Sequence, residues 1–405
     1  MSTSEGQPIR VAMVVLSQYP SDPRVRREAE ALERHGIEVD VICLREAADA
    51  AEERRGTVTA YRVAPMQAKE RMERYLWITA RFMAASLLKL MSLSRRRRYD
   101  VVQFHNMPDY LVFLGLFHRL RGVPVVLDLH DLTVELFESR YGASWARRLL
   151  PLVRLAERFS CALATRLITT SSGFEQRLVE RGIPAGKITL ILNTADPAIF
   201  HGGGQRSFAR IDRDLRLLYH GSVKERFGVH TAIEALSMVA KEVPGATLRI
   251  HGRYDPSYRD RLEALIGRLE LRDRVHLGEY LSLESVRELM LGADMGLVPY
   301  LSDPFMDIAL STKSFEYVAM GLPVVSSRLP SMQSIFDEQS VAYFAPGSAA
   351  EMAARIVELC RRPEERQQMV RRASASCRDI SWPAMEKRYV DLIEELARRR
   401  RKSGS

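Results

Sequence analysis

Residues 9–44, IRVAMVVLSQYPSDPRVRREAEALERHGIEVDVICL, carry the pattern that decides the fold. The apolar runs at the two ends of this stretch are typical of buried strands. Between them, Asp22 is placed to cap a helix that has Pro23 in its first position and Gly36 just after its end. A strand, a helix and a second strand in this order predict one unit of a parallel sheet with helices on its faces.

The same alternation repeats along almost the whole chain, with one interruption. We expect strands at 9–16, 37–44, 101–105, 123–129 and 166–170 before the interruption, and at 215–219, 247–251, 275–277, 295–298, 323–326 and 341–344 after it. The interruption, residues 193–205, contains a proline and three consecutive glycines and is the best linker in the sequence. The pattern predicts an α/β protein of two doubly wound domains, 1–200 and 206–381, with a linker at 201–205. Ligands of such sheets bind outside the carboxyl ends of the strands, here in the cleft between the domains.

Composition narrows the class of protein. The 405 residues are 46% hydrophobic and 27% charged, which is ordinary for a soluble globular protein. Four widely spaced cysteines without a CxxC pair exclude a disulfide scaffold or a zinc ribbon and fit a reducing cytoplasm. We expect no signal peptide and, because no run reaches about 18 apolar residues, no transmembrane helix. The 60 Lys and Arg against 51 Asp and Glu give a net charge of +9, which leaves nucleic acid or an anionic membrane as obvious partners.

Residues 307–325, DIALSTKSFEYVAMGLPVV, contain the most informative candidate site. Ser311 and Thr312 are placed to cap a helix, and the free N–H groups of a helix N-terminus favour anions. Lys313 is unfavourable to the helix dipole, which indicates another use such as binding a phosphate, and Glu316 can accept hydrogen bonds from a ribose. From these residues alone, a capped surface helix with solvated charges is an equally good interpretation.

This stretch resembles the nucleotide-sugar site of the family 4 glycosyltransferases through Lys313, the run FEY at 315–317 and the run AMGLPVV at 319–325. The resemblance spans nearly the whole chain, and its other motifs are, in order, YPSDPRVRRE at 19–28, HNMPD at 105–109, DLHD at 128–131 and GSVKERFG at 221–228. Members of this family are retaining enzymes of the GT-B fold, in which two Rossmann-like domains face each other across a cleft. The resemblance also implies that the last helix, 382–401, packs back on the first domain.

The resemblance assigns the donor site to the second domain. Glu316 matches the acid that holds the donor ribose, whereas the acid expected to touch the sugar falls on Ile308, and Asp307 is the nearest carboxylate. Ser222 stands where the family usually has an arginine for the diphosphate. The donor-binding residues that the resemblance implies are therefore Gly221, Ser222, Lys224, Arg226, Arg253, Tyr280, Asp307, Ser311, Thr312, Lys313 and Glu316.

Because Ser222 stands at the arginine position, we expect the diphosphate to be bound by Lys224, Arg226 and Lys313. We expect Arg226 and Lys313 to act in catalysis by stabilising the charge of the departing diphosphate, so that no metal and no cofactor is required. The alternative for Lys224 and Arg226 is a solvated loop. Arg253 and Tyr280 lie in turns that resemble those beside the nucleobase, and both UDP and GDP donors are compatible with them.

The first domain supplies candidate residues for the sugar and the acceptor. His130 sits where related enzymes place a histidine near both, and Asp131 is placed to orient its ring or to bind acceptor hydroxyls; we expect both to be catalytic. His105 and Asn106 end the preceding strand and reach the same rim on the acceptor side. Arg24 is placed either to reach a phosphate or to be an exposed residue after the cap. Without the resemblance, a lone histidine at a strand end is more often structural.

The positive charge is concentrated in two clusters. Residues 69–98 combine a helical apolar pattern with Lys69, Arg71 and Trp77 and end in four arginines, and residues 398–402 are five consecutive cations. Such segments fit an anionic membrane surface. The alternative is that the apolar stripe of 69–98 packs on the sheet and its charges are solvated. We expect no nucleic acid partner, because the sequence has no recognisable helix-turn-helix or RNP-like motif.

These expectations combine into a cytoplasmic enzyme on the inner face of the cell membrane. We expect a retaining, metal-independent hexosyltransferase of polysaccharide biosynthesis that moves a sugar from a nucleoside diphosphate to a lipid-linked or envelope glycan. Two alternatives remain open. A nucleotide-sugar epimerase can use the same fold, and a non-catalytic sugar-nucleotide-binding partner of another transferase is compatible with Ile308 and Ser222.

Overall fold

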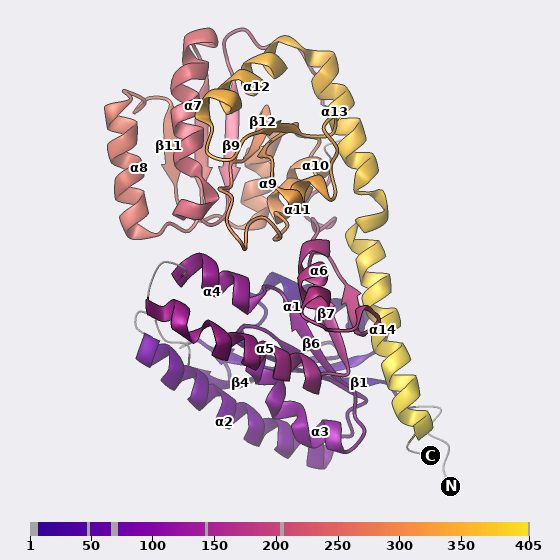
Figure 1. Cartoon of the computed structure of the whole chain (residues 1–405). Coiled ribbons are helices and arrows are strands. Elements are labelled where there is room, and N and C mark those ends of the chain that lie inside the picture. Colours follow the sequence, from indigo (N-terminus) through magenta and orange to yellow (C-terminus); the bar gives the residue numbers. More distant parts are fainter. Residues whose placement is uncertain (1–6, 47–48, 66–71, 142–144, 203–205, 404–405) are drawn as a thin grey trace. The chain divides into compact units, whose positions relative to one another are not determined.

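The computed structural model describes residues 7–46, 49–65, 72–141, 145–202 and 206–403, which form two compact units. The first unit combines the chain up to Leu192 with its end from Pro383, and the second runs from Asn193 to Trp382. The boundary therefore lies at Leu192 rather than near residue 200. Residues 203–205 of the expected linker lie outside the described residues. Each unit is built on its own sheet (Figure 1).

The first unit contains an eight-stranded sheet in the order β3-β4-β2-β1-β5-β6-β7-β8. Its strands are β1 (Arg10–Gln18), β2 (Glu38–Arg45), β3 (Glu52–Arg55), β4 (Val58–Pro65), β5 (Val101–His105), β6 (Val125–Leu129), β7 (Arg166–Thr169) and β8 (Ile188–Leu190). Neighbouring strands are parallel except β3 and β4. The expectation of a wholly parallel sheet is wrong at this edge, because a tight turn with Gly56 at a φ of 57° folds β4 back along β3.

Helices cover both faces of this sheet. They are α1 (Pro23–Arg34), α2 (Met72–Arg96), α3 (Leu116–Leu120), α4 (Thr133–Tyr141), α5 (Leu150–Leu163), α6 (Ser172–Glu180) and α14 (Trp382–Ser403), with 3₁₀ turns η1 (Asp109–Gly115) and η2 (Trp145–Leu149). Gln103 and Phe104 are consecutive in β5 and point to opposite faces. Gln103 meets side chains of α1 and α14, whereas Phe104 packs against Gly115 of η1. The two faces are thus covered by different helices.

Helix α2 lies on β1, β2, β4 and η1. Phe82 and Leu90 are fully buried there, whereas Trp77 and Leu88 are exposed. By length and composition its part Leu76–Arg96 is also apolar enough to cross a membrane, and a third of that stretch is buried within the unit. The expected absence of a transmembrane helix rested on the lack of about 18 consecutive apolar residues, and this stretch is interrupted by Arg81 and Lys89. One side of α2 therefore packs its apolar residues against the sheet, and a second set of apolar residues on the helix is exposed.

The second unit contains a six-stranded parallel sheet in the order β11-β10-β9-β12-β13-β14. Its strands are β9 (Arg216–His220), β10 (Thr247–His251), β11 (Val275–Gly278), β12 (Met295–Val298), β13 (Val324–Ser327) and β14 (Ala342–Phe344). Its helices are α7 (Val229–Glu242), α8 (Pro256–Arg268), α9 (Leu283–Leu291), α10 (Thr312–Ala319), α11 (Pro330–Gln333), α12 (Ala349–Arg361) and α13 (Pro363–Ser376). The strand order reverses between β9 and β12, the position where sheets of this type bind ligands.

Helix α14 carries the end of the chain along the first unit. The Tyr389 hydroxyl donates to Gln103 Oε1 at 2.8 Å, and Arg401 is bound to Asp100 and to the carbonyls of Gln7 and Pro8. Arg398 and Arg399 pair with glutamates one turn earlier in the helix. The five cations at 398–402 are therefore not all available to a membrane, since several are neutralised within the unit.

Candidate functional site

His130 follows β6 at the carboxyl edge of the first sheet. Its Nε2 lies 2.8 Å from Asp128 Oδ2, so this carboxylate orients the ring. Asp128 is fully buried, whereas 18% of the His130 side chain is exposed. The imidazole therefore lies at the rim of the sheet, and its Nδ1 is the nitrogen that can meet a substrate hydroxyl. The sequence assigned the orienting role to Asp131 and missed Asp128, although two residues separated by one in a strand end point the same way.

Arg24 holds both oxygens of the Asp128 carboxylate. Its Nε donates to Oδ2 and its Nη2 donates to Oδ1, each at 2.8 Å. Burial alone would raise the pKa of Asp128, but the charge of Arg24 and the contacts of His130 and His105 outweigh it and hold this pKa well below its usual value. Arg24 is only 5% exposed, so the expectation that it reaches a phosphate or solvent is wrong. It is a buried counterion at the site.

His105 and Asn106 are buried behind His130. His105 Nδ1 lies 3.2 Å from both Asp128 Oδ2 and His130 Nε2, and burial lowers the pKa of His105. Asn106 Oδ1 accepts a hydrogen bond from the His130 N–H at 2.8 Å, and its Nδ2 donates to the Asp131 carbonyl at 2.6 Å. Both residues thus position residues 130–131 from inside, which corrects the expectation that they face an acceptor directly.

A chain of buried polar side chains connects this site to the last helix. Glu28 of α1 pairs with Arg24 at 3.2 Å and accepts from Gln103 Nε2 at 2.7 Å. Gln103 in turn accepts from Tyr389 of α14. Burial, with the charge of Asp128, raises the pKa of Glu28 well above its usual value. Helices α1 and α14 therefore both support the geometry at His130.

Three potential metal ligands meet in the same place. The ligand atoms of His105, Asp128 and His130 lie within 4.8 Å of one another. The guanidinium of Arg24 already engages both carboxylate oxygens of Asp128, so a metal cation would meet a fixed positive charge. The donor set does not favour a metal ion.

In the second unit, Lys313 lies in the first turn of α10 at the reversal between β9 and β12. Its Nζ donates to the Tyr300 hydroxyl at 2.9 Å and is 5.3 Å from the ring centroids of Tyr219, Phe227 and Tyr300. The ammonium group is thus surrounded by aromatic faces, which attract a cation without neutralising its charge. These three aromatic residues were not predicted from the sequence, because they come from separate loops and strands.

Gly221 lies directly under the Lys313 side chain. A Cβ at this position would lie 2.7 Å from Lys313 Cε, and the residue has a φ of +99°. Gly252, in the turn after β10, also needs its small size, because a Cβ there would lie 1.6 Å from the Gly221 carbonyl oxygen. The two turns at the carboxyl ends of β9 and β10 are therefore packed backbone to backbone.

Glu316 is 7% exposed and lies one turn further along α10. Its Oε2 is 3.2 Å from Nε2 of His220, the last residue of β9. Burial and then the charge of Lys313 lower the pKa of His220 well below its usual value, so this imidazole is neutral. His220 is a further site residue that was not predicted from the sequence. Its position at the end of a strand, just before Gly221, could have identified it.

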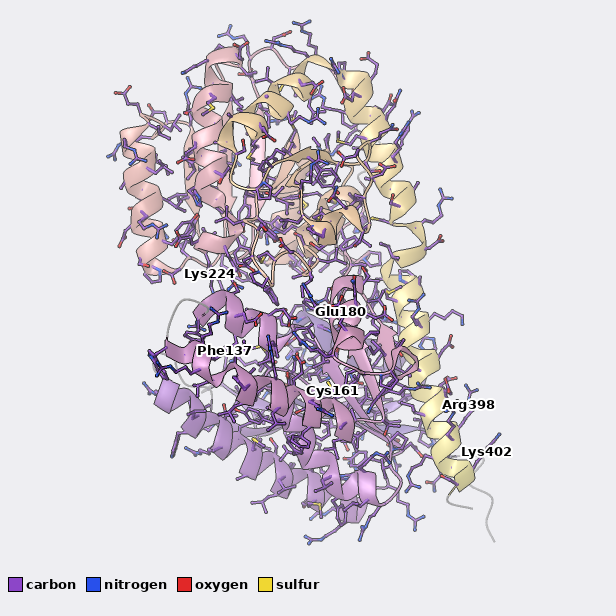
Figure 2. The ribbon with its side chains drawn as sticks, in the orientation of Figure 1. Phe137, Cys161, Glu180, Lys224, Arg398 and Lys402 are labelled. Atoms are coloured by element: carbon purple, nitrogen blue, oxygen red, sulfur yellow. The ribbon has the colours of Figure 1, made fainter. Side chains whose placement is uncertain are left out.

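The remaining cations of the loop after β9 are unequally placed. Lys224 is exposed, and Figure 2 shows its side chain at the surface of the unit. Arg226 is partly buried, with Nε 4.0 Å from Asp303 Oδ2 and its guanidinium over the Phe305 ring. Ser222 contributes its carbonyl, which accepts from the Tyr219 hydroxyl at 2.6 Å.

The segment before α10 holds the other donor-site candidates. Ser302 Oγ donates to Asp307 at 2.9 Å, while Ile308 is buried. Ser311 is the N-cap residue, but its hydroxyl donates to Tyr300 at 3.1 Å and makes no capping bond, which corrects the expectation that it caps the helix through its side chain. Thr312 is the first residue of α10.

Arg253 and Tyr280 come together at the ends of β10 and β11. The Arg253 guanidinium lies 4.3 Å from the Tyr280 ring centroid, and both side chains are exposed. The Arg253 carbonyl accepts from the Val223 N–H at 2.9 Å, which ties this pair to the loop after β9. The second unit thus gathers all its predicted donor residues along the carboxyl edge of one sheet.

Comparisons with known proteins agree with this division. The model of a glycosyl transferase 4-like domain matches residues 21–194, and that of glycosyl transferases group 1 matches residues 214–362. An uncharacterized glycosyltransferase of Methanocaldococcus jannaschii is 26% identical over 348 residues, covering 82% of this chain and 83% of that protein.

Solved structures show the same fold. Sucrose-phosphate synthase from Thermosynechococcus elongatus superposes with a TM-score of 0.76 at 19% identity, covering 96% of this chain and 99% of that chain. HepE of Anabaena, in complex with UDP, superposes with a TM-score of 0.70 at 15% identity, covering 96% and 100%. The expectation of a GT-B architecture is confirmed.

Proposed function

The chain belongs to the family 4 glycosyltransferases of the GT-B fold, and from this premise we propose that it moves a sugar from a UDP- or GDP-sugar to a hydroxyl group with retention of configuration. The observation that carries the donor half is the placement of Lys313 and Glu316 on α10, next to the reversal between β9 and β12. The complex of HepE, a protein of the same fold, with UDP supports a nucleotide ligand for this chain.

In this proposal the second unit holds the leaving group. Negative charge builds up on the diphosphate as its bond to the sugar breaks, and fixed cations stabilise that charge. Lys313 keeps its charge within the aromatic surround and supplies the first cation, and Arg226 and the exposed Lys224 supply the others, without a metal ion. Glu316 offers its carboxylate to the ribose hydroxyls, and its Oε2 lies 3.2 Å from Nε2 of His220.

The first unit acts on the sugar and the acceptor. Asp128 holds Nε2 of His130, which leaves Nδ1 to hydrogen-bond a sugar or acceptor hydroxyl. Asn106 fixes the backbone at His130 and Asp131, so both side chains leave the strand end in defined directions. The carboxylate of Asp131 then serves acceptor hydroxyls.

We further propose a lipid-linked or envelope glycan acceptor and a site of action at the inner face of the cell membrane. The support is the exposed apolar and basic part of α2: Trp77 lies beside Arg81, Leu88 is exposed, and the helix ends in the exposed Arg95 and Arg96. The predicted residues 69–71 lie outside the described residues. The cluster at 398–402 supports it less, because Arg401 is bound to Asp100.

The donor site is tested by ligand-induced stabilisation and by transfer assays. A bound nucleotide raises the melting temperature, so a panel of UDP, GDP and their sugars identifies the donor. We expect Lys313→Met and Glu316→Gln to lose this shift and to lower kcat/KM for transfer by about 100-fold or more. Lys241→Met and Glu288→Gln, exposed residues of α7 and α9, are the matched controls.

Three results would contradict the proposal. Normal transfer activity of Lys313→Met or Glu316→Gln would show that the donor does not bind at these residues. Binding of nucleotide without transfer to any hydroxyl acceptor favours the non-catalytic alternative. An epimerised nucleotide-sugar formed without an acceptor favours the epimerase.

A further inference from the structure

The first unit exposes large apolar side chains on the layer formed by α2, η1, α3, η2 and α5. The most exposed are Leu88 (72%), Leu120 (78%), Trp145 (76%) and Leu152 (62%), and Phe159 (54%) follows two turns after Leu152. Contiguous apolar surface of this kind on a soluble unit marks an interaction site. Only the α2 part of this layer was anticipated from the sequence.

These side chains belong to one continuous surface. Both α2 and α5 contact η1, and α3 continues directly from η1. Phe104 of β5 packs on η1 from the inside, so the sheet lies behind this layer and its other side is solvent (Figure 1). Along η2 and α5, residues 145, 149, 152, 155 and 159 recur at helical spacing and are all exposed.

The charge of the surface is strongly positive. Arg119 and Arg121 flank Leu120, and Arg147, Arg148 and Arg158 are interleaved with the apolar residues of η2 and α5. Among the described residues of α5, the acid is Glu157, which is buried and bound to Arg181 rather than facing outward. Arginines beside Trp, Leu and Phe are the composition of an interfacial membrane helix, because the guanidinium reaches headgroups while the aromatic and aliphatic groups enter the acyl region.

We propose that η2 and α5, with α3 and the outer side of α2, form the surface by which this protein lies on an anionic lipid bilayer. The proposal rests on the acceptor half of the proposed function and assigns the contact to residues 145–159 rather than to 398–402. An acidic protein would satisfy the arginines, but it gives no reason for a strip of exposed Trp, Leu and Phe along η2 and α5. A bilayer accounts for both.

Vesicle flotation without donor or acceptor tests the surface by itself. We expect the protein to float with vesicles of phosphatidylglycerol and phosphatidylcholine, and far less with phosphatidylcholine alone. Each cation near an anionic leaflet changes the partition coefficient about fivefold, so the triple variant Arg147→Gln, Arg148→Gln, Arg158→Gln loses on the order of 100-fold. The triple variant Arg398→Gln, Arg399→Gln, Lys402→Gln removes the same charge from α14 and stays within about threefold of the unmodified protein.

The apolar strip is tested separately. Leu152→Ser with Phe159→Ser is expected to lower partitioning by roughly tenfold or more, since two large side chains no longer enter the acyl region. Val179→Ser on α6 also alters an exposed apolar residue of this unit and is the matched control. Unchanged melting temperatures and an unchanged nucleotide-induced shift show that the variants are folded and that the donor site is intact.

Two results overturn the proposal. Flotation that is independent of the 145–159 variants places the membrane contact elsewhere. A concentration-dependent dimer, seen by light scattering and abolished by Leu152→Ser with Phe159→Ser, assigns the strip to a second copy of the chain. Either result leaves the donor panel unaffected, so failure of this surface and failure of the proposed transferase activity are distinguishable.

Discussion

The two candidate half-sites hold their principal side chains in opposite ways. In the first unit, His130 is the partly exposed end of a buried polar chain in which Arg24 and Asp128 neutralise each other. In the second, Lys313 lies among three aromatic rings and the Tyr300 hydroxyl. Among the described residues no carboxylate is paired with Lys313.

This difference indicates what each side chain has to do. A lysine without a carboxylate partner keeps its full charge for an anionic ligand, and the aromatic faces keep it in place. An imidazole bound to a buried carboxylate instead has its orientation set by the protein before any ligand arrives. The half-site around Lys313 is therefore arranged to attract an anionic ligand, and the half-site around His130 is arranged to hold an imidazole in one orientation.

The largest effect is expected from breaking the buried ion pair of the first unit. Arg24→Met removes the counterion of Asp128 and leaves a buried carboxylate unpaired, which costs about 3–5 kcal/mol of the free energy of unfolding. Urea unfolding measures this loss. Arg26→Met is the matched control on the same helix, because its pair with Glu30 is partly exposed at 3.8 Å and surface pairs contribute about 1 kcal/mol or less.

The contrast between the two half-sites would fail if Arg24→Met and Arg26→Met lowered the free energy of unfolding by the same small amount. In that case Asp128 does not depend on Arg24, and the first half-site is not organised by its buried charges. A variant that stays folded but loses transfer at unchanged donor KM identifies Arg24 as a positioning residue for His130 rather than a purely structural one.

Much of the scaffold could be predicted from the sequence, because it follows from local patterns. The apolar runs at 101–105, 247–251 and 295–298 coincide with β5, β10 and β12, and Asp22 caps α1 through its side chain as expected. The short strand β3 has no such pattern, because its residues EERR are charged and mostly exposed.

The site was less predictable, since its decisive contacts join distant segments. Arg24 and Asp128 are 104 residues apart, and nothing in the motif around Arg24 shows that its guanidinium turns inward. Resemblance located Lys313 and Glu316, but the aromatic surround of Lys313 and the contact of Glu316 with His220 depend on how strands and loops pack. Local pattern identifies the elements, and tertiary packing decides which charges face solvent.

A second, pH-dependent effect distinguishes the buried histidines of the two half-sites. The pKa of His220 is lowered by burial and by Lys313, whereas for His105 burial lowers the pKa and Asp128 opposes it. Unfolded histidine binds a proton near pH 6.5, so as pH falls below about 6.5 the unfolded state gains protons that folded His220 does not take, and stability is lost.

This sign predicts that wild-type stability falls relative to His220→Gln as pH falls from about 6.5, by up to about 1.4 kcal/mol per pH unit. Urea unfolding at a series of pH values gives the slope, which is insensitive to any constant cost of the substitution. His105→Gln is expected to flatten the slope less. Equal slopes for the two variants would show that His220 and His105 contribute alike, and the distinction between the two histidines would then fail.

The smallest effect is expected at Tyr300, where two substitutions distinguish the contribution of the hydroxyl from that of the aromatic ring. Tyr300→Phe keeps the aromatic face over Lys313 but removes a hydrogen-bond acceptor worth about 1 kcal/mol, so the donor KM is expected to rise about fivefold or less. Tyr300→Leu also removes the cation–π contact and is expected to raise it further, by about two- to thirtyfold. If the phenylalanine variant instead loses as much as Lys313→Met, the hydroxyl and not the aromatic surround holds the ammonium group. The second half-site would then resemble the first, with one directed polar contact fixing its key side chain, and the contrast between attracting and orienting would no longer hold.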